Sequence, residues 1–266
     1  MKVPDQELLA CDYVFPVFGA STGRTETEVK ELCGTAFPIG PGIFVTAGHV
    51  LRNALTHKTA AIGFGTEGRS SSWIGSPIRD TEFLDHDMGL CRAAVPPSAR
   101  VMSLVWEDRA PEPLRTAVGA LGYPYGLDIE SNMIIVRAFR GHIVCERFQK
   151  QLPGSPRVYE LSFPCPRGLS GAPLWLDDDA LVVGVVVGNH ITEMEVYSET
   201  EVEKETGRET VFRKTEALHL GLAVTSQAIL GLRSTMLKGT VKEWLSQEGL
   251  LRSQQSEETE MHGGNG

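Results

Sequence analysis

The sequence predicts an all-β fold in which two six-stranded antiparallel β-barrels lie side by side and short C-terminal helices follow. Apolar or alternating runs are short, and glycine, proline, aspartate and serine interrupt them, which is typical of strands. These runs form two groups of about six, separated by the proline-rich stretch 96–113. The 266 residues suffice for one large domain or for two smaller ones that share a cleft. Two groups of strands therefore predict two barrels.

The two groups of candidate strands set the domain boundaries. We expect an N-terminal barrel over 11–100, a C-terminal barrel over 101–225, C-terminal helices over 226–251 and a disordered tail over 252–266. The strand candidates of the first barrel are 13–19, 34–39, 42–47, 59–64 and 87–94. Those of the second barrel are 116–124, 133–139, 141–148, 157–163, 172–176, 180–188 and 220–226.

Helices and one long connection complete the expected architecture. Residues 48–55 predict a helix of one or two turns, and Ser226 and Thr240 are the candidate N-caps of the C-terminal helices. The connection 190–217 carries eight Glu against four Lys or Arg residues. Long connections without structure of their own are either functional or mobile. We therefore interpret 190–217 as a solvated hairpin or a flexible insertion.

Composition limits the classes of partner and the compartment. The formal net charge is −9, and broad binding to a nucleic-acid backbone needs clustered Lys and Arg instead. The first residues contain no apolar run of signal-peptide length, and the longest apolar stretch, 181–188, is too short for a bilayer. We expect a cytoplasmic protein with no nucleic-acid or membrane partner. Five scattered cysteines without a C-x-x-C pair predict free thiols, and no cofactor or metal is expected.

Three short motifs carry residues that could perform acyl transfer together. They are "TAGH" at 46–49, "DMGL" at 87–90 and "GLSGAP" at 168–173. Each one alone is ordinary turn chemistry, because Ser, Asp and Gly are common in turns. A serine hydroxyl is a weak nucleophile, however, and needs a neutral imidazole to take its proton. The three motifs supply a histidine, a carboxylate and a serine in that order.

Together the motifs resemble those of the chymotrypsin/trypsin-like serine peptidases, and "GYPYG" at 122–126 is similar to a segment of bacterial members. The resemblance spans roughly residues 11–236. It implies that Ser170 is the nucleophile, His49 the general base and then acid, and Asp87 the carboxylate that fixes the histidine tautomer. It also implies that the amides of Gly168 and Ser170 form the oxyanion hole. Asp85 and His86 compete with Asp87, but only Asp87 is followed by the apolar-small-Leu pattern.

The chain also departs from the digestive members of this family. Leu169 stands where those members carry a carboxylate that pairs with a newly cleaved N-terminus, so activation by that route is not expected. By resemblance, segments 163–168, 186–189 and 220–222 wall the specificity pocket. The residues expected to contact substrate there are Pro164, at its floor, Val187, Gly188 and Gly221. The absence of a carboxylate from these segments predicts an uncharged substrate side chain.

The resulting hypothesis is an intracellular serine endopeptidase that cuts a partner protein selectively. Gating by a partner or effector, through the loop 164–169 or the insertion 190–217, is part of this hypothesis, as is a role in bacterial defence or signalling. The alternative is a non-catalytic peptide-binding module with a peptidase fold. Two further enzymatic interpretations are less well supported by the sequence. They are an α/β-hydrolase that uses Asp178 and His219, and a metal hydrolase built on His49, His57, His86 and Asp87.

Overall fold

The computed structural model describes residues 12–22, 27–66, 69–113, 116–125, 127–128, 133–202 and 209–252. Residues 253–266 of the predicted tail lie outside the described residues. Arg252, the first residue assigned to the tail, instead lies in a short strand. No described helix combines the length and the apolar character that crossing a membrane requires.

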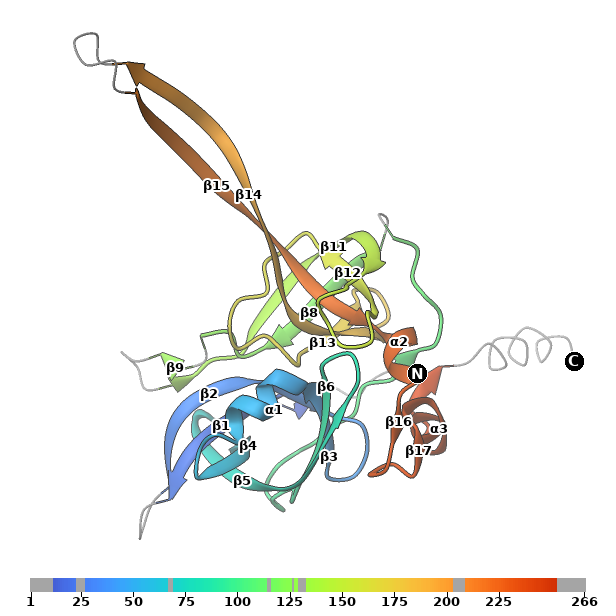
Figure 1. Cartoon of the computed structure of the whole chain (residues 1–266). Coiled ribbons are helices and arrows are strands. Elements are labelled where there is room, and N and C mark those ends of the chain that lie inside the picture. Colours follow the sequence, from blue (N-terminus) through green and yellow to red (C-terminus); the bar gives the residue numbers. More distant parts are fainter. Residues whose placement is uncertain are drawn as a thin grey trace, which may run out of the picture.

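The first barrel is a closed ring of six antiparallel strands in the order β1-β2-β3-β6-β5-β4. Its interior is filled by apolar side chains, among them the rings of Phe15, Phe44 and Phe64, whose centroids lie 5.1 to 6.0 Å apart. The strands are β1 (Phe15–Thr22), β2 (Thr27–Pro38), β3 (Ile43–Ala47), β4 (Thr59–Thr66), β5 (Arg69–Leu84) and β6 (Met88–Ala93). Helix α1 (Gly48–Ala54) follows β3 directly, as the sequence predicted (Figure 1).

The second barrel is also six-stranded. The order is β13-β8-β11-β12-β15-β14, and pairing of β13 with β14 closes the ring. Its strands are β8 (Ala117–Gly122), β11 (Arg137–Phe148), β12 (Arg157–Leu161), β13 (Pro173–Leu176), β14 (Val182–Val202) and β15 (Glu209–Thr225). The short strands β7 (Trp106–Glu107) and β18 (Leu251–Arg252) extend this sheet in parallel from β14. The predicted all-β double barrel is therefore confirmed.

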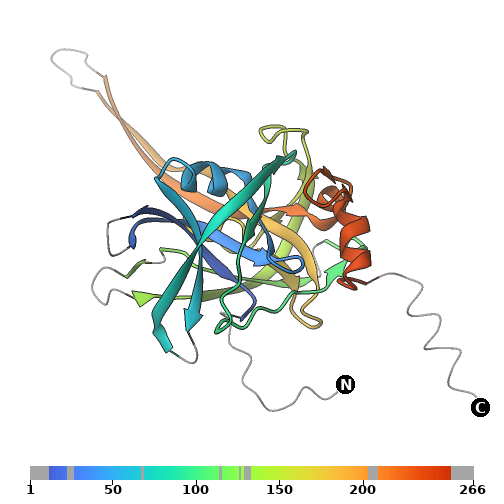
Figure 2. The ribbon, with the colours of Figure 1, turned by 90° about the horizontal axis from the view of Figure 1, so that it is seen from below.

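The C-terminal segment contains two short helices, α2 (Ser226–Leu230) and α3 (Val241–Gln247), on the opposite side of the molecule from the long hairpin (Figures 1 and 2). The predicted cap of α3 is confirmed, because Thr240 and Glu243 form a reciprocal capping box. The predicted cap of α2 is wrong by one residue. Thr225 has extended backbone angles and accepts from the Ala228 amide at 3.3 Å, whereas Ser226 lies inside the helix and is buried.

Four two-residue strands lie in the remaining described connections, and the Glu82 carboxylate contacts the C-terminal segment. These strands are β9 (Leu127–Asp128), β10 (Met133–Ile134), β16 (Arg233–Ser234) and β17 (Gly239–Thr240). Glu82 of β5 accepts hydrogen bonds from the Ser234 hydroxyl at 2.6 Å and from the amides of Thr235 and Met236 at 2.7 and 2.9 Å. Glu82 is thus one of the side chains that hold the C-terminal segment to the first barrel, together with Trp244 of α3, whose indole donates to the Ile39 carbonyl.

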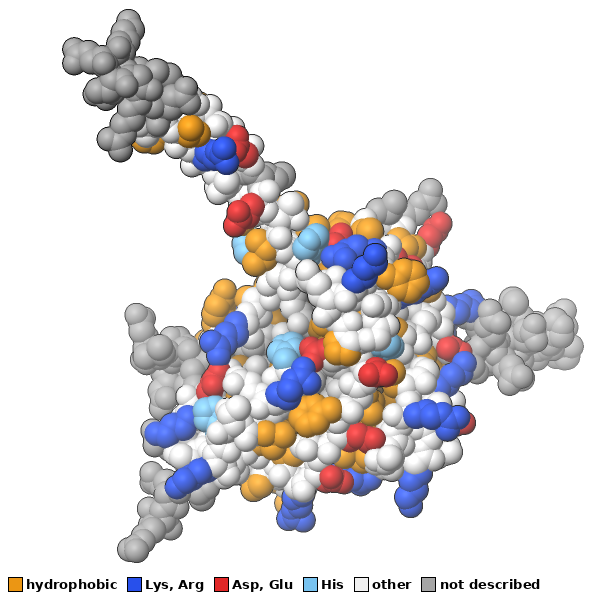
Figure 3. All heavy atoms as spheres, in the orientation of Figure 1, with side chains coloured by type: hydrophobic (Ala, Val, Ile, Leu, Met, Phe, Trp, Pro, Cys, Tyr) orange, Lys and Arg blue, Asp and Glu red, His pale blue; other side chains and the backbone are white. Residues whose placement is uncertain are grey.

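Strands β14 and β15 continue beyond the barrel as a twisted two-stranded hairpin that projects from the molecule (Figure 1). We refer to residues 190–202 and 209–220 as the arm. Pairing continues along the arm from His190↔Leu220 to Val202↔Glu209, with one irregularity between Glu195 and Tyr197. In Figure 3 the arm stands clear of the body and shows acidic, basic and hydrophobic side chains next to one another. The predicted insertion is therefore a regular hairpin.

Candidate active site

His49 and Asp87 meet at the start of helix α1. His49 lies in the first turn of the helix, and Asp87 lies in the turn between β5 and β6. The His49 Nδ1 and the Asp87 Oδ2 are 2.6 Å apart, and the His49 amide donates to the Asp87 Oδ1 at 3.0 Å. Ala47, the residue at the cap position, makes no side-chain cap bond, so Asp87 satisfies a free amide of the first turn. One carboxylate thus holds both the backbone and the ring of His49.

The turn that presents Asp87 also explains why its neighbours do not compete for the same role. His86 and Asp87 both have positive φ, at 65° and 57°, and the amide of Met88 closes the turn on the Asp85 carbonyl at 3.2 Å. The His86 ring lies 3.1 Å from the carbonyl of Pro153, and its amide donates to the same carbonyl. Of these three side chains, the structure brings Asp87 to His49.

Asp87 is nearly buried, with 7% of its side chain exposed. Burial raises the pKa of its carboxyl group, but the hydrogen bond and charge of His49, together with the Arg52 guanidinium, outweigh this and lower that pKa overall. Arg52 contacts the Asp87 Oδ1 and lies over the Phe83 ring, 5.6 Å from its centroid. Arg52 belongs to none of the three sequence motifs. Its place one helical turn after His49 was the available signal.

Ser170 lies on the loop before β13, and both this loop and helix α1 pack against Gly34 of β2. The Ser170 carbonyl accepts from the Thr35 amide at 2.9 Å. A Cβ added to Gly34 would lie 2.5 Å from Val50 Cγ2 and 2.8 Å from the Ser170 carbonyl oxygen. Val50 follows His49 directly, so the loop and the helix that carry these two residues approach across the barrel interface. Within the described residues, no hydrogen bond joins the Ser170 hydroxyl to His49.

Gly171 shows the same close approach. Its φ is +86°, and an added Cβ would lie 2.0 Å from the Thr35 carbonyl oxygen and 3.0 Å from the Ala47 amide nitrogen. Only glycine fits this position, because a side chain would collide with the first barrel. Gly171 therefore lets the loop of the second barrel approach the backbone of Ala47, which lies two residues before His49.

The amides of Gly168 and Ser170 make no hydrogen bond within the described part of the chain. The neighbouring peptide groups are fixed, since the Arg167 carbonyl accepts from Tyr125 at 3.0 Å and the Leu169 carbonyl from Ala172 at 3.0 Å. Because the N–H of a trans peptide points away from its C=O, these two bonds also orient the Gly168 and Ser170 amides. The loop therefore has two amide donors with fixed orientation, and an oxyanion hole is built from donors of this kind.

Thr35 supports this loop, although it belongs to none of the sequence motifs. Its fully buried hydroxyl donates to the Gly168 carbonyl at 2.8 Å and accepts from the Tyr123 amide at 3.1 Å. Tyr123 lies in the "GYPYG" segment, and its own hydroxyl donates to the Val14 carbonyl at 2.9 Å. Leu169 is fully buried beside the Gly122 backbone. No local pattern identifies Thr35, because its partners are more than 80 residues away in sequence.

The predicted pocket walls lie together in the second barrel. Asn189 holds the backbone of Cys165, accepting from its amide at 2.6 Å and donating to its carbonyl at 2.7 Å. The Gly221 amide donates to the Phe163 carbonyl at 2.9 Å, and a Cβ on Gly221 would lie 2.5 Å from Cys165 Sγ. The predicted substrate contacts differ in burial: Pro164 is exposed, Gly188 is partly exposed, and Val187 and Gly221 are buried. Asn189, which the sequence analysis did not single out, ties two of these segments together.

The two other enzymatic interpretations find little support in this geometry. A nucleophile elbow of an α/β-hydrolase requires a helix after the serine, but β13 follows Ser170. His219 lies on the arm, and Asp178 is exposed in the turn after β13. Of the histidines suggested for a metal hydrolase, His57 contacts Glu31 at 3.2 Å and His86 faces Pro153.

Comparison with known proteins gives a likeness of fold. No protein-family model and no curated protein matches the chain. A solved structure of the HtrA-type protease AlgW with a decapeptide matches 82% of this chain and 62% of its own, with 13% identity and a TM-score of 0.52. The chain has the fold of trypsin-like serine peptidases. It spans less than two thirds of the AlgW chain. Rv3671c from M. tuberculosis H37Rv, in an inactive mutant form, matches with 18% identity over 87% of this chain and 93% of its own, with a TM-score of 0.49.

Proposed function

We propose that the protein is a serine endopeptidase with Ser170 as nucleophile, His49 as general base and acid, and Asp87 as the carboxylate that orients His49. The observation that carries this proposal is the 2.6 Å contact between His49 Nδ1 and Asp87 Oδ2. This contact leaves the other ring nitrogen of His49 available for proton transfer. The free amides of Gly168 and Ser170 support the proposal, since they provide the donors that a tetrahedral intermediate needs.

In this mechanism the Ser170 Oγ attacks the substrate carbonyl while His49 Nε2 takes the hydroxyl proton. The oxyanion that forms accepts hydrogen bonds from the Gly168 and Ser170 amides. His49 then gives its proton to the leaving amine, and an acyl-enzyme on Ser170 remains. A water molecule, deprotonated by His49, hydrolyses this ester and restores the serine. The Ser170 to His49 hydrogen bond is expected to form when substrate binds, because catalytic hydrogen bonds often tighten in the Michaelis complex.

A fluorophosphonate probe tests this proposal directly. We expect the probe to label the wild-type protein, Ser170→Ala to abolish labelling and His49→Ala to slow it strongly. Ser198→Ala, a change on the exposed arm, serves as the matched control and should label like the wild type. A wild-type protein that binds peptide but resists the probe would instead be the non-catalytic peptide-binding module.

We also propose that the peptidase acts on a partner protein inside the cell and that contact with a partner at the arm controls it. The free state of Cys33, Cys91, Cys145 and Cys165 supports a reducing compartment. The arm supports the control. Its strands are continuous with the predicted pocket wall, and Asn189 at its base holds Cys165 at the start of the loop 164–169. A role in bacterial defence or signalling is the wider form of this hypothesis.

Replacing the arm by a short turn tests the control. We expect the purified wild-type protein to cleave casein slowly, and the protein without residues 191–218 to lose the response to its partner while the fluorophosphonate still labels Ser170. A purified wild-type protein that cleaves casein at the rate of a digestive peptidase would contradict gating. Co-expression of the wild type and Ser170→Ala with neighbouring genes would show the substrate as a protein whose size changes only with the wild type.

A further inference from the structure

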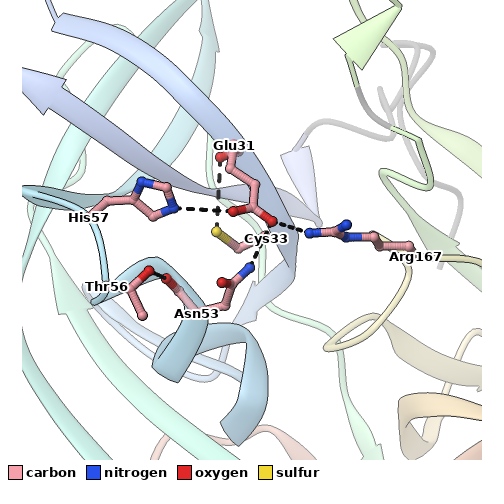
Figure 4. Close-up of polar contacts among 6 residues, drawn as sticks. All are labelled: Glu31, Cys33, Asn53, Thr56, His57 and Arg167. Carbon is pink, nitrogen blue, oxygen red and sulfur yellow. Dashed lines mark hydrogen bonds and ion pairs between the residues drawn. The ribbon is translucent and has the colours of Figure 1, made fainter.

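Beside the proposed active site, three side chains with different ligand atoms converge on one point. They are Glu31 and Cys33 of β2 and His57, which follows α1 (Figure 4). A carboxylate oxygen, the Cys33 Sγ and a ring nitrogen of His57 all lie within 4.8 Å of one another. The cluster is enclosed but reachable: Cys33 is 6% exposed, and the side chains of Glu31 and His57 are 26% and 22% exposed. None of these three residues has a role in the proposed mechanism.

The backbone is shaped to bring these groups together. Val17 of β1 pairs with Gly34 and Phe18 with Leu32, so Cys33 is the extra residue of a β-bulge. Such bulges redirect side chains and are frequent next to active sites. Gly19 makes room for the imidazole, because an added Cβ there would lie 2.1 Å from the His57 Cδ2. The His57 ring can therefore lie against the strand and point its Nε2 at Glu31, 3.2 Å away.

We propose that Glu31, Cys33 and His57 form a binding site for a zinc ion, in which a water molecule completes a tetrahedral set. Zinc accepts thiolate, imidazole and carboxylate ligands and is commonly four-coordinate in proteins. Magnesium and calcium prefer oxygen ligands, so the mixed donor set selects against them. The Cys33 thiol gives its proton to solvent as the metal–sulfur bond forms.

The site is coupled to the proposed oxyanion loop through Arg167. Glu31 accepts from Asn53 at 2.9 Å and forms an ion pair with Arg167, the residue before Gly168 (Figure 4). Arg167 and Asn53 contact the Oε1 of Glu31, whereas His57 faces its Oε2. Zinc bound through Oε2 would neutralise the carboxylate and repel the guanidinium, so it would weaken the Arg167 ion pair and with it a support of the loop. Zinc in this site is expected to inhibit the peptidase, and this second step depends on the proposed function.

Cobalt(II) titration tests the binding step without reference to activity. We expect one equivalent of Co²⁺ to produce a thiolate-to-cobalt absorption band in the wild type, and Zn²⁺ to displace it. Cys33→Ser should lose the band, whereas Cys145→Ser, a partly exposed thiol outside the cluster, should keep it. His57→Gln should weaken binding by at least about 10-fold, and Arg167→Gln should strengthen it. Absence of the band from the wild type, or its persistence in Cys33→Ser, would overturn the proposed site.

Labelling of Ser170 by the fluorophosphonate tests the coupling. One equivalent of Zn²⁺ should slow labelling in the wild type, and a chelator should restore it. The labelling rate of Cys33→Ser should not respond to the same addition. Equal slowing in both proteins would place the inhibitory ion elsewhere and refute the coupling. If the metal-free wild type is not labelled at all, the proposed function fails, while the cobalt band still decides whether the metal site exists.

Discussion

The buried hydroxyl of Thr35 joins the two barrels, because it donates a hydrogen bond of 2.8 Å to the carbonyl of Gly168. The same hydroxyl accepts from the Tyr123 amide, and the Thr35 amide donates to the Ser170 carbonyl. A residue of the first barrel thus fixes three points around the loop of the second barrel that carries Ser170. The alignment of that loop depends on the barrel interface as well as on its own sequence.

Replacing Thr35 by valine should therefore affect stability and activity together. Thr35→Val keeps the shape of the side chain but removes the hydrogen bond that Tyr123 donates to the hydroxyl and leaves the Gly168 carbonyl without its Thr35 donor. We expect a loss of about 1–3 kcal/mol in the free energy of unfolding, since that is the usual cost of an unsatisfied buried group. The labelling rate of Ser170 should fall by about 10-fold or more, because losing a whole oxyanion donor costs about 10²–10³. Urea denaturation and labelling kinetics measure the two effects. Thr35→Ser, which retains the hydroxyl, should restore most of both.

Asp87→Asn should reduce peptidase activity by about 10⁴. The asparagine amide favours the wrong tautomer of His49, and it carries no negative charge that could stabilise the imidazolium. The fold should persist, since asparagine can still accept from the His49 amide. Steady-state kinetics with a peptide substrate measures the loss. Asp85→Asn is the control, because the Asp85 contribution to this turn is its backbone carbonyl. Equal losses in the two variants would contradict the role assigned to Asp87.

Acid should weaken the attachment of the C-terminal segment to the first barrel at Glu82. Burial raises the pKa of the Glu82 carboxyl, but hydrogen bonds from Ser234, Thr235 and Met236 outweigh it and lower that pKa overall. A pKa that is lower in the folded state contributes stability above the unfolded value of about 4.3, and this contribution is lost as pH falls through the folded value. The bonds that hold the segment should therefore weaken in acid below about pH 4.

The variant Glu82→Gln should remove this pH dependence and cost about 1–2 kcal/mol near neutral pH, because it loses charge-assisted hydrogen bonds. Trp244 of α3 reports on the docking, since its indole donates to the Ile39 carbonyl at 2.6 Å. The chain has four tryptophans, so the part of the fluorescence that Trp244→Phe removes, followed during urea denaturation at neutral and acidic pH, measures the effect. Glu193→Gln on the exposed arm should behave like the wild type. A Glu82→Gln protein with an unaltered acid transition would rule out this explanation.

The substrate side chain before the cleaved bond should be uncharged. The segments 163–168, 186–189 and 220–222 contain no Asp or Glu, and the cation in this region is Arg167. A pocket without a carboxylate offers no partner for a buried Lys or Arg side chain. A peptide library should therefore yield products that end in apolar or small residues. A profile dominated by Arg or Lys would refute the prediction. It would indicate that the glutamates of the arm attract a basic substrate.

The sequence was most informative where a feature is local. The helix after β3 and the capping of α3 by Thr240 depend on neighbouring residues, and the structure has both in the expected form. Strand β5 was missed, because its 16 residues include serines, a proline and several charges and do not alternate cleanly. The bulge between Ile78 and Asp80 shifts the pattern further.

Contacts between the barrels could not be derived from patterns. Thr35, Arg52 and the pair Glu31–Arg167 act through partners that lie 35 to 136 residues away along the chain. Composition and periodicity describe each segment by itself, and they contain no information on which loop faces which strand. Asn189 could not be identified for the same reason. A polar residue directly after an apolar run is common, and only the structure shows that this one binds the Cys165 backbone.

The exposed strand edges of the arm favour self-association of the protein in solution. Beyond the barrel its described strands pair with each other, so the outer edge of each presents backbone N–H and C=O groups to any other extended chain. Ile191, Tyr197 and Phe212 are each more than half exposed along it. The excess of Glu over Lys and Arg in 190–217 opposes edge-to-edge association of copies through charge repulsion. Screening by salt or neutralisation in acid would weaken that repulsion, and self-association of the protein would then begin at this hairpin.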